Sequence, residues 1–186
     1  MQTVVAELEV AFAVKEGWMN VAGQIFVALL SLSDAAAVPA PAGWGPGPSG
    51  QFRFSAGGAP VYLLECKATE VVVTQFGVTQ LVDLQANRPV GDTEGTALPP
   101  GAALMALATD RTDEPNMMPA AAVRNPDKGW DMTIRLAKDD PALLSLPRAK
   151  FISLFTTGFT RAAKLSKGEQ KLLAAFMNRC RGKIPG

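Results

Sequence analysis

The sequence predicts an α+β fold: a mostly antiparallel β-sheet or partly open barrel over about residues 1–138, followed by a basic C-terminal helical segment. Apolar and polar residues alternate with a period of two in several stretches before residue 138, which is typical of strands with one face in water. After residue 140 the charge changes sign. Residues 141–186 hold nine Lys or Arg and one acid, a net charge of +8, whereas residues 1–140 hold nine basic and sixteen acidic residues.

The opening residues predict a long β-hairpin. Residues 4–14 alternate as a strand with one wet face, and residues 18–32 read as a second, more apolar strand. The apolar run 21–32 is about half as long as the roughly 20 residues that a membrane-spanning helix needs. The N-terminus also lacks the cationic region of a secretory signal. We therefore expect a protein that is neither secreted nor transmembrane, located in the cytoplasm or within a virion.

Residues 1–140 are expected to form an acidic, β-rich body with Pro- and Gly-rich loops at residues 35–50 and 87–101. Short runs rich in Val, Thr and aromatic residues predict its further strands, at residues 51–54, 61–66, 70–76, 78–84 and, as the last strand, 130–136. Gly77 predicts a bulge or bend. Residues 110–125 are expected to be a loop.

Residues 141–186 are expected to form helices packed on this body. Asp140 followed by Pro141 is typical of an N-cap with Pro at the first helical position. Three phenylalanines recur every four residues, which indicates a helix weakened by a glycine, at Phe151, Phe155, Phe159 and Gly158. Ser166 and Glu169 match a capping box, which opens an amphipathic helix over residues 167–181. Its apolar side is predicted to hold Leu172, Leu173, Phe176, Met177 and Cys180.

The basic segment favours binding to nucleic acid. Each Lys or Arg that neutralises a phosphate releases condensed counterions, so a stripe of them binds without regard to base sequence. We expect seven cations to take this role: Arg161, Lys164, Lys167, Lys171, Arg179, Arg181 and Lys183. Trp44, held between glycines and prolines, is a candidate for stacking on a base. The three phenylalanines are further candidates, although their helical spacing favours a position in the core.

No catalytic residue, metal ligand or cofactor is predicted. The chain has no His, the usual general base near neutral pH, and no phosphate-loop or nucleophile-elbow motif. A generic cluster of Asp110, Asp113 and Glu114 leaves a carboxylate–metal nuclease as the third alternative. Cys66 and Cys180 match no ligand spacing. We expect them to be reduced thiols, with a long-range disulfide as the less favoured alternative.

A non-enzymatic nucleic-acid-binding protein, such as a phage or plasmid accessory protein, is the leading expectation. Whether it binds DNA or RNA, single or double strands, is left open. The second expectation is a structural, virion-type protein that self-associates when the acidic body of one copy meets the basic segment of another. A cationic amphipathic helix can also lie on an anionic membrane, but here the apolar face is needed for docking on the body, so no membrane partner is expected.

Overall fold

The computed structural model describes residues 42–90, 97–125 and 128–182. They belong to one compact unit, Val38–Gly186. The expected hairpin over residues 4–14 and 18–32, and Lys183, lie outside the described residues. No helix within the described ranges is long and apolar enough to cross a membrane.

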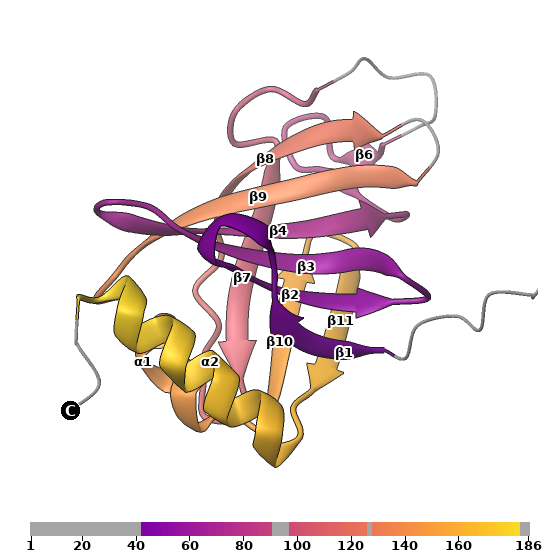
Figure 1. Cartoon of the computed structure of the whole chain (residues 1–186). Helices are drawn as coiled ribbons and strands as arrows, with labels where there is room; N and C mark the ends of the chain where they lie inside the picture. Colours follow the sequence, from indigo (N-terminus) through magenta and orange to yellow (C-terminus); the bar gives the residue numbers. More distant parts are fainter. Residues whose placement is uncertain (1–41, 91–96, 126–127, 183–186) are drawn as a thin grey trace, which may run out of the picture. The chain divides into compact units, whose positions relative to one another are not determined.

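Nine strands form one antiparallel sheet in the order β1-β2-β3-β4-β9-β8-β7-β10-β11 (Figure 1). Their bounds are β1 Gly43–Pro46, β2 Gln51–Ala56, β3 Ala59–Cys66, β4 Glu70–Val78, β7 Ala103–Thr109, β8 Met118–Asn125, β9 Gly129–Ala137, β10 Phe151–Thr156 and β11 Phe159–Lys164. A small separate pair is formed by β5 (Val82–Asp83) and β6 (Arg88–Pro89). The helices are α1 (Pro141–Ser145) and α2 (Lys167–Cys180), with single 3₁₀ turns at Pro48–Gly50 and Leu146–Arg148.

The sheet curls into a half-barrel, because β7, β10 and β11 run steeply across β2, β3 and β4 (Figure 1). The core lies on its concave side, where alternate residues of each strand point inward. In β9, for example, Trp130, Met132, Ile134 and Leu136 are all buried. Gly77 has a left-handed φ of 68°, and the register between β4 and β9 shifts beside it. The expected antiparallel sheet and the bulge at Gly77 are therefore confirmed.

The prediction of a wholly helical C-terminal segment is wrong, because β10 and β11 form an antiparallel hairpin within it. A spacing of four residues places side chains on one face of a strand as well as on one face of a helix, so the phenylalanines did not distinguish the two. The hairpin turns at Thr157 and Gly158, where Gly158 has a φ of 98°. This turn puts Phe159 on the inner face opposite Thr156, whereas Phe151 and Phe155 lie on the outer face.

Two other stretches also differ from expectation. Residues 110–125, expected to be a loop, contain the strand β8. Residues 78–84, expected to be a strand, contribute only the last residue of β4 and the short β5. The strand β8 was missed because it contains three alanines, and alanine has a low propensity for strands. Ala120 and Ala122 are nevertheless buried members of the hydrophobic core. Packing of this kind overrides intrinsic strand propensity.

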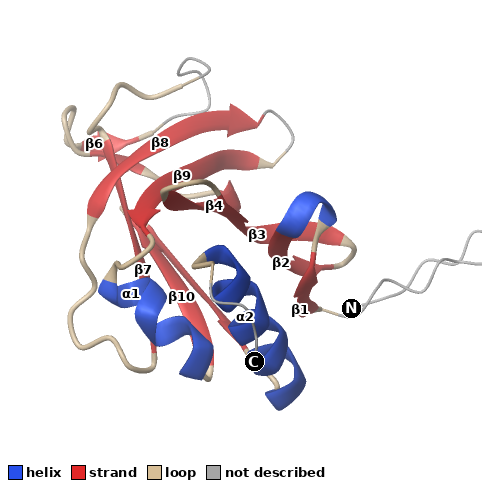
Figure 2. Cartoon of the chain, turned by 60° about the vertical axis from the view of Figure 1, so that its left-hand side comes forward, coloured by secondary structure: helices blue, strands red, loops and turns tan. Residues whose placement is uncertain are grey.

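Helix α2 is fastened to the sheet at both of its ends. At its N-terminus, the Glu169 carboxylate accepts the backbone N–H of Trp44 in β1 as well as that of Ser166, which completes the predicted capping box. At its C-terminus, a disulfide joins Cys180 to Cys66 at the end of β3. Between these ends its apolar face, formed by Leu173, Phe176, Met177 and Cys180, is buried. The last helix is thus part of the fold, next to α1 on the same side of the sheet (Figure 2).

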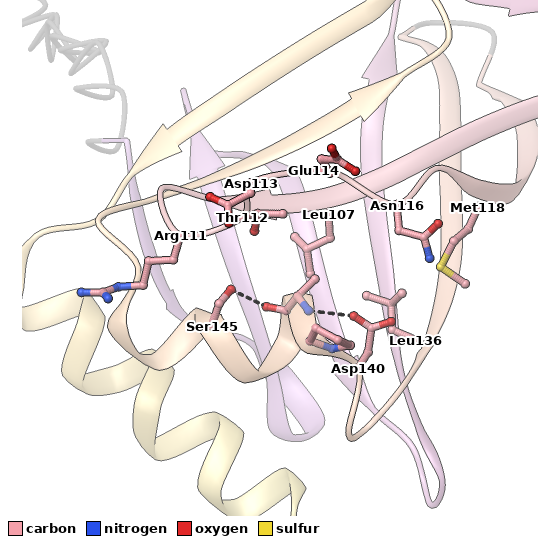
Figure 3. Close-up of a pocket in the computed structure, with 12 residues that line it drawn as sticks. Leu107, Arg111, Thr112, Asp113, Glu114, Asn116, Met118, Leu136, Asp140 and Ser145 are labelled. Carbon is pink, nitrogen blue, oxygen red and sulfur yellow. Dashed lines mark hydrogen bonds between the residues drawn. The ribbon is translucent and has the colours of Figure 1, made fainter.

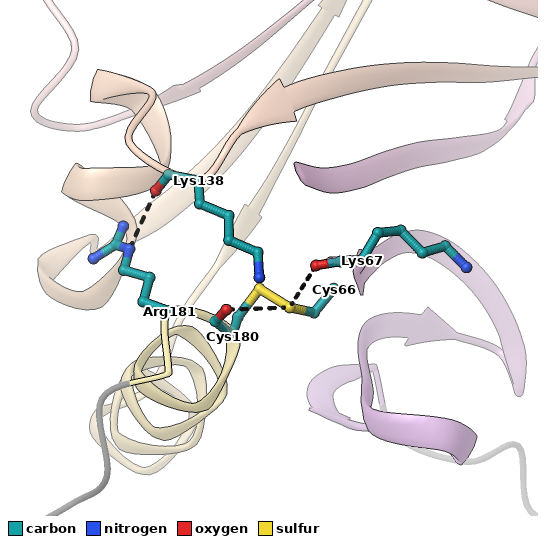
Figure 4. The surroundings of a disulfide bond; sticks show 5 residues. All are labelled: Cys66, Lys67, Lys138, Cys180 and Arg181. Carbon is teal, nitrogen blue, oxygen red and sulfur yellow. Dashed lines mark hydrogen bonds between the residues drawn. A yellow bond between two sulfur atoms is a disulfide. The ribbon is translucent and has the colours of Figure 1, made fainter. Parts of the chain in front are cut away.

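The disulfide corrects the expectation of reduced thiols. Cys66 and Cys180 are 114 residues apart in sequence, but their Cα atoms lie 5.6 Å apart, a normal separation for a bridge. Figure 4 shows the bond beside Lys67, Lys138 and Arg181. No sequence spacing could reveal this pairing, because it depends on where α2 docks.

The hydrogen bonds of Glu169 predict a pH dependence of stability. Burial alone would raise the pKa of Glu169, but hydrogen bonds from Ser166 and the backbone N–H of Trp44 outweigh it and hold that pKa below its usual value. A lowered pKa stabilises the fold above the unfolded-state value near pH 4.3, and this contribution is lost as the pH falls through the folded-state pKa. Glu169→Gln should lower the free energy of unfolding at pH 7 by about 1 kcal/mol. Denaturant titrations should show the difference shrinking below about pH 4; a difference that stays constant down to pH 2 would contradict this account.

Candidate nucleic-acid interface

The exposed face of α2 carries only positive charges. Lys167, Lys171 and Arg179 are exposed, and at 100° per residue they fall within an arc of about 120°. Glu169 is the only acid of the helix, and its two oxygens are turned toward backbone N–H groups of Trp44 and Ser166. The acid that would otherwise neutralise this face is thus used to fasten the helix.

A further exposed cation, Lys164, ends β11 three residues before α2 begins. Lys164 is exposed and lies directly opposite Phe151 of β10, so the two side chains share the outer face of the hairpin. Phe151 is 40% exposed. Lys150, which precedes Phe151 in the sequence, is also exposed, and its backbone carbonyl accepts the N–H of Leu165 (2.8 Å). We call Lys150, Lys164, Lys167, Lys171 and Arg179 the cationic surface.

Of the seven cations predicted from the sequence, four are exposed on the end of β11 and on α2, whereas Arg161 and Arg181 make other contacts. Arg161 lies on the opposite face of β11 from Lys164, with its guanidinium carbon 5.9 Å from the centre of the Phe159 ring. Arg181 donates from Nε to the carbonyl of Lys138 (3.3 Å) and from Nη2 to that of Leu143 (2.8 Å). These bonds make Arg181 a structural contact between α2 and the α1 region. Figure 4 shows the bond to Lys138.

The prediction that Trp44 stacks on a base of nucleic acid is wrong. It is only 5% exposed and its ring packs on Phe52, Phe54 and Tyr62, with centroids 5.3–5.7 Å apart. The prediction failed because the Pro- and Gly-rich stretch around Trp44 contains a short edge strand, β1, rather than only loop. Trp44 therefore belongs to the core, and Phe151 is the exposed aromatic beside the cations.

One acid lies at the border of the cationic surface. The Asp110 carboxylate accepts the backbone N–H of Lys150 (2.7 Å), and this hydrogen bond holds the pKa of Asp110 below its usual range. Asp110 is thus charged at neutral pH and offsets one cation. Arg111, whose Nε donates to the carbonyl of Arg148 (3.2 Å), places a positive charge near the Asp110 carboxylate.

A pocket of about 310 Å³ lies between β7, β9 and α1 (Figure 3). Asp113 and Glu114 line it, but Asp110, the third member of the predicted carboxylate cluster, does not. The remaining acid that lines the pocket, Asp140, is the N-cap of α1, and its carboxylate accepts the backbone N–H of Ala142. Within the described ranges, no three His, Cys, Asp or Glu side chains are placed to hold a metal ion; the nuclease alternative stays a prediction.

The hydroxyl groups of Ser145 and Tyr62 are two possible nucleophiles, but neither is activated. Ser145, which lines the pocket, donates to the carbonyl of Ala142 (2.7 Å) and meets the Thr109 hydroxyl (3.0 Å), so it secures α1. Burial raises the pKa of the Tyr62 phenol, and the charge of Arg161 offsets only part of that shift. Tyr62 therefore remains protonated at physiological pH.

No known protein family, curated protein or solved structure matches this chain. A functional conclusion therefore has to come from the chemistry of the described surface.

Proposed function

We propose that the protein binds nucleic acid through the cationic surface, without catalysing a reaction. The observation that carries the proposal is the one-sided charge of α2: Lys167 and Lys171 face outward while Glu169 faces the sheet. Lys164 and Lys150 extend this charge along the adjoining hairpin. Such a row of lysines can bind the phosphates of a nucleic-acid backbone, because each lysine–phosphate contact releases condensed counterions.

The mechanism is electrostatic and independent of base sequence. Lysines place point charges on flexible stems, so they follow a phosphate backbone without demanding one geometry. From Lys171 to Arg179 the helix advances about 12 Å, and Lys164 and Lys167 precede them along the chain. The binding site is thus a track that can contact several consecutive phosphates. Affinity should fall steeply as salt is added.

Replacing Lys164, Lys167 and Lys171 together by Gln should flatten this salt dependence. Each phosphate contact contributes roughly 0.7 to 0.9 to the slope of log affinity against log salt, so the slope should decrease by about 2 to 3. The measurement is fluorescence anisotropy with labelled single- and double-stranded oligonucleotides across a salt series. Circular dichroism should show an unchanged fold, because all three side chains are exposed.

A matched control removes three positive charges elsewhere. Arg53, Lys128 and Arg135 are exposed and lie on β2, the β8–β9 turn and β9, so their replacement by Gln changes the net charge equally. Arg135 also forms a surface ion pair with Glu70, so circular dichroism should check the fold of this variant as well. This variant should retain most of the wild-type slope. If both triple variants lose the same affinity, binding depends on net charge alone and the assigned surface is wrong. Absence of wild-type binding at low salt to any DNA or RNA would refute the proposal itself.

Self-association of acidic and basic regions remains the second prediction, which no contact in this single chain tests. Sedimentation at increasing protein concentration would detect it.

On the location of the protein, the disulfide favours an oxidising environment. Of the two expected locations, a virion is more compatible with the disulfide than a reducing cytoplasm. We also propose a phage or plasmid origin.

A further inference from the structure

The outer face of the β10–β11 hairpin presents an aromatic ring beside the cationic surface. Phe151 is 40% exposed, although its cross-strand partner is the charged Lys164 and not another apolar residue. The next pair on the same face, Ser153 and Ala162, has short side chains, and Phe155 follows opposite Thr160. Ser153 is buried, whereas Ala162 and Lys164 on the neighbouring strand are exposed, so the free part of the Phe151 ring borders these two side chains.

The charges around Phe151 indicate what kind of partner covers it. A second copy of this face would bring Lys150 and Lys164 toward equivalent lysines, and like charges placed opposite one another disfavour such a contact. A duplex offers phosphates to the lysines, but its bases are stacked inside the helix and give the ring nothing to contact. An unpaired strand offers both groups, since each base has an open face and each nucleotide a phosphate.

We infer that the surface prefers single-stranded nucleic acid, with a base stacked on Phe151 and an adjacent phosphate on Lys164. This inference rests on the proposed function and adds its strand class. Stacking on an aromatic ring is tolerant of base identity, because every base has a π-face. The preference is thus for unpaired strands of any sequence.

The test compares Phe151→Leu with the wild type on a labelled oligothymidylate and on a blunt duplex of equal length. Leucine keeps an apolar side chain in the strand but removes the ring. Affinity for the single strand should fall by about 5- to 150-fold, whereas duplex affinity and both salt slopes should stay unchanged. As a control, Leu172→Ala alters another exposed apolar residue, 47% exposed on α2, and should leave both affinities unchanged.

Phe151→Trp supplies an independent readout. The new indole should retain single-strand binding, and its fluorescence should be quenched when a base stacks on it. This variant also serves if Phe151→Leu melts at a much lower temperature than the wild type. Equal losses on single strand and duplex, or binding by Phe151→Trp without quenching, would overturn the stacking inference and leave the proposed function standing. Absence of wild-type binding to both probes would remove both.

Discussion

Removing the Cys66–Cys180 disulfide should lower the free energy of unfolding by about 4 kcal/mol. The bridge joins residues 114 positions apart, so it closes a long loop and restricts the unfolded chain strongly; the effect grows with the logarithm of loop length. The expected result is a large shift of the denaturant midpoint in the double variant Cys66→Ala/Cys180→Ala. The wild type treated with a reductant should show a similar shift.

Each single Cys→Ala variant provides the control, because either one breaks the bond. All three variants and the reduced wild type should therefore fall close together. Hydrogen exchange should accelerate most at the C-terminal end of α2, next to Cys180, while the capping box keeps the start of the helix protected. Identical unfolding curves for oxidised and reduced protein would show that the bond contributes nothing to the fold.

Phe176→Ala should destabilise the protein by about 3 to 5 kcal/mol. Phe176 is 2% exposed, and its ring centroid lies 5.7 Å from that of Phe52 in β2. Truncation removes the burial of the ring and leaves a cavity between α2 and the sheet, and the disulfide and Glu169 prevent the helix from settling to fill it. Equilibrium unfolding by urea measures the change.

Leu172 on the same helix is the matched control for Phe176. It lies on the predicted apolar side but is 47% exposed, so Leu172→Ala should change stability by less than about 1 kcal/mol. A comparable loss in the two variants would mean that helix propensity, and not burial against β2, determines the contribution of α2. The comparison also tests the position of the helix, since rotation about its axis would exchange the two results.

Local signals in the sequence predicted the parts of this fold that depend on near neighbours. The capping box at Ser166 and Glu169, the N-cap at Asp140 and the bulge at Gly77 each require only a few consecutive residues. The alternation in residues 130–136 likewise identified β9. Such features follow from backbone geometry and hydrogen-bonding groups that the local sequence specifies.

The parts that could not be predicted depend on contacts between distant residues. Phe151 and Phe155 satisfy helix and strand periods equally, and only pairing of β10 with β7 resolves the ambiguity. The disulfide and the burial of Trp44 both require knowledge of where α2 docks. For the proposed site, the lysines of α2 were predicted from the charge composition, and they stay a prediction. The exposed ring of Phe151 became apparent only when strand pairing placed it opposite Lys164.

The double attachment of α2 has a consequence for the rate of the proposed binding to nucleic acid. A basic segment that folds on contact with its ligand must order itself after the encounter, and that ordering takes up part of the interaction free energy. Here the lysines of α2 are displayed by a helix already held at Glu169 and Cys180. Association should therefore proceed without a folding step, at a rate governed by long-range attraction and lowered by added salt. Its heat-capacity change should be small, as expected for a rigid surface that meets a flexible strand.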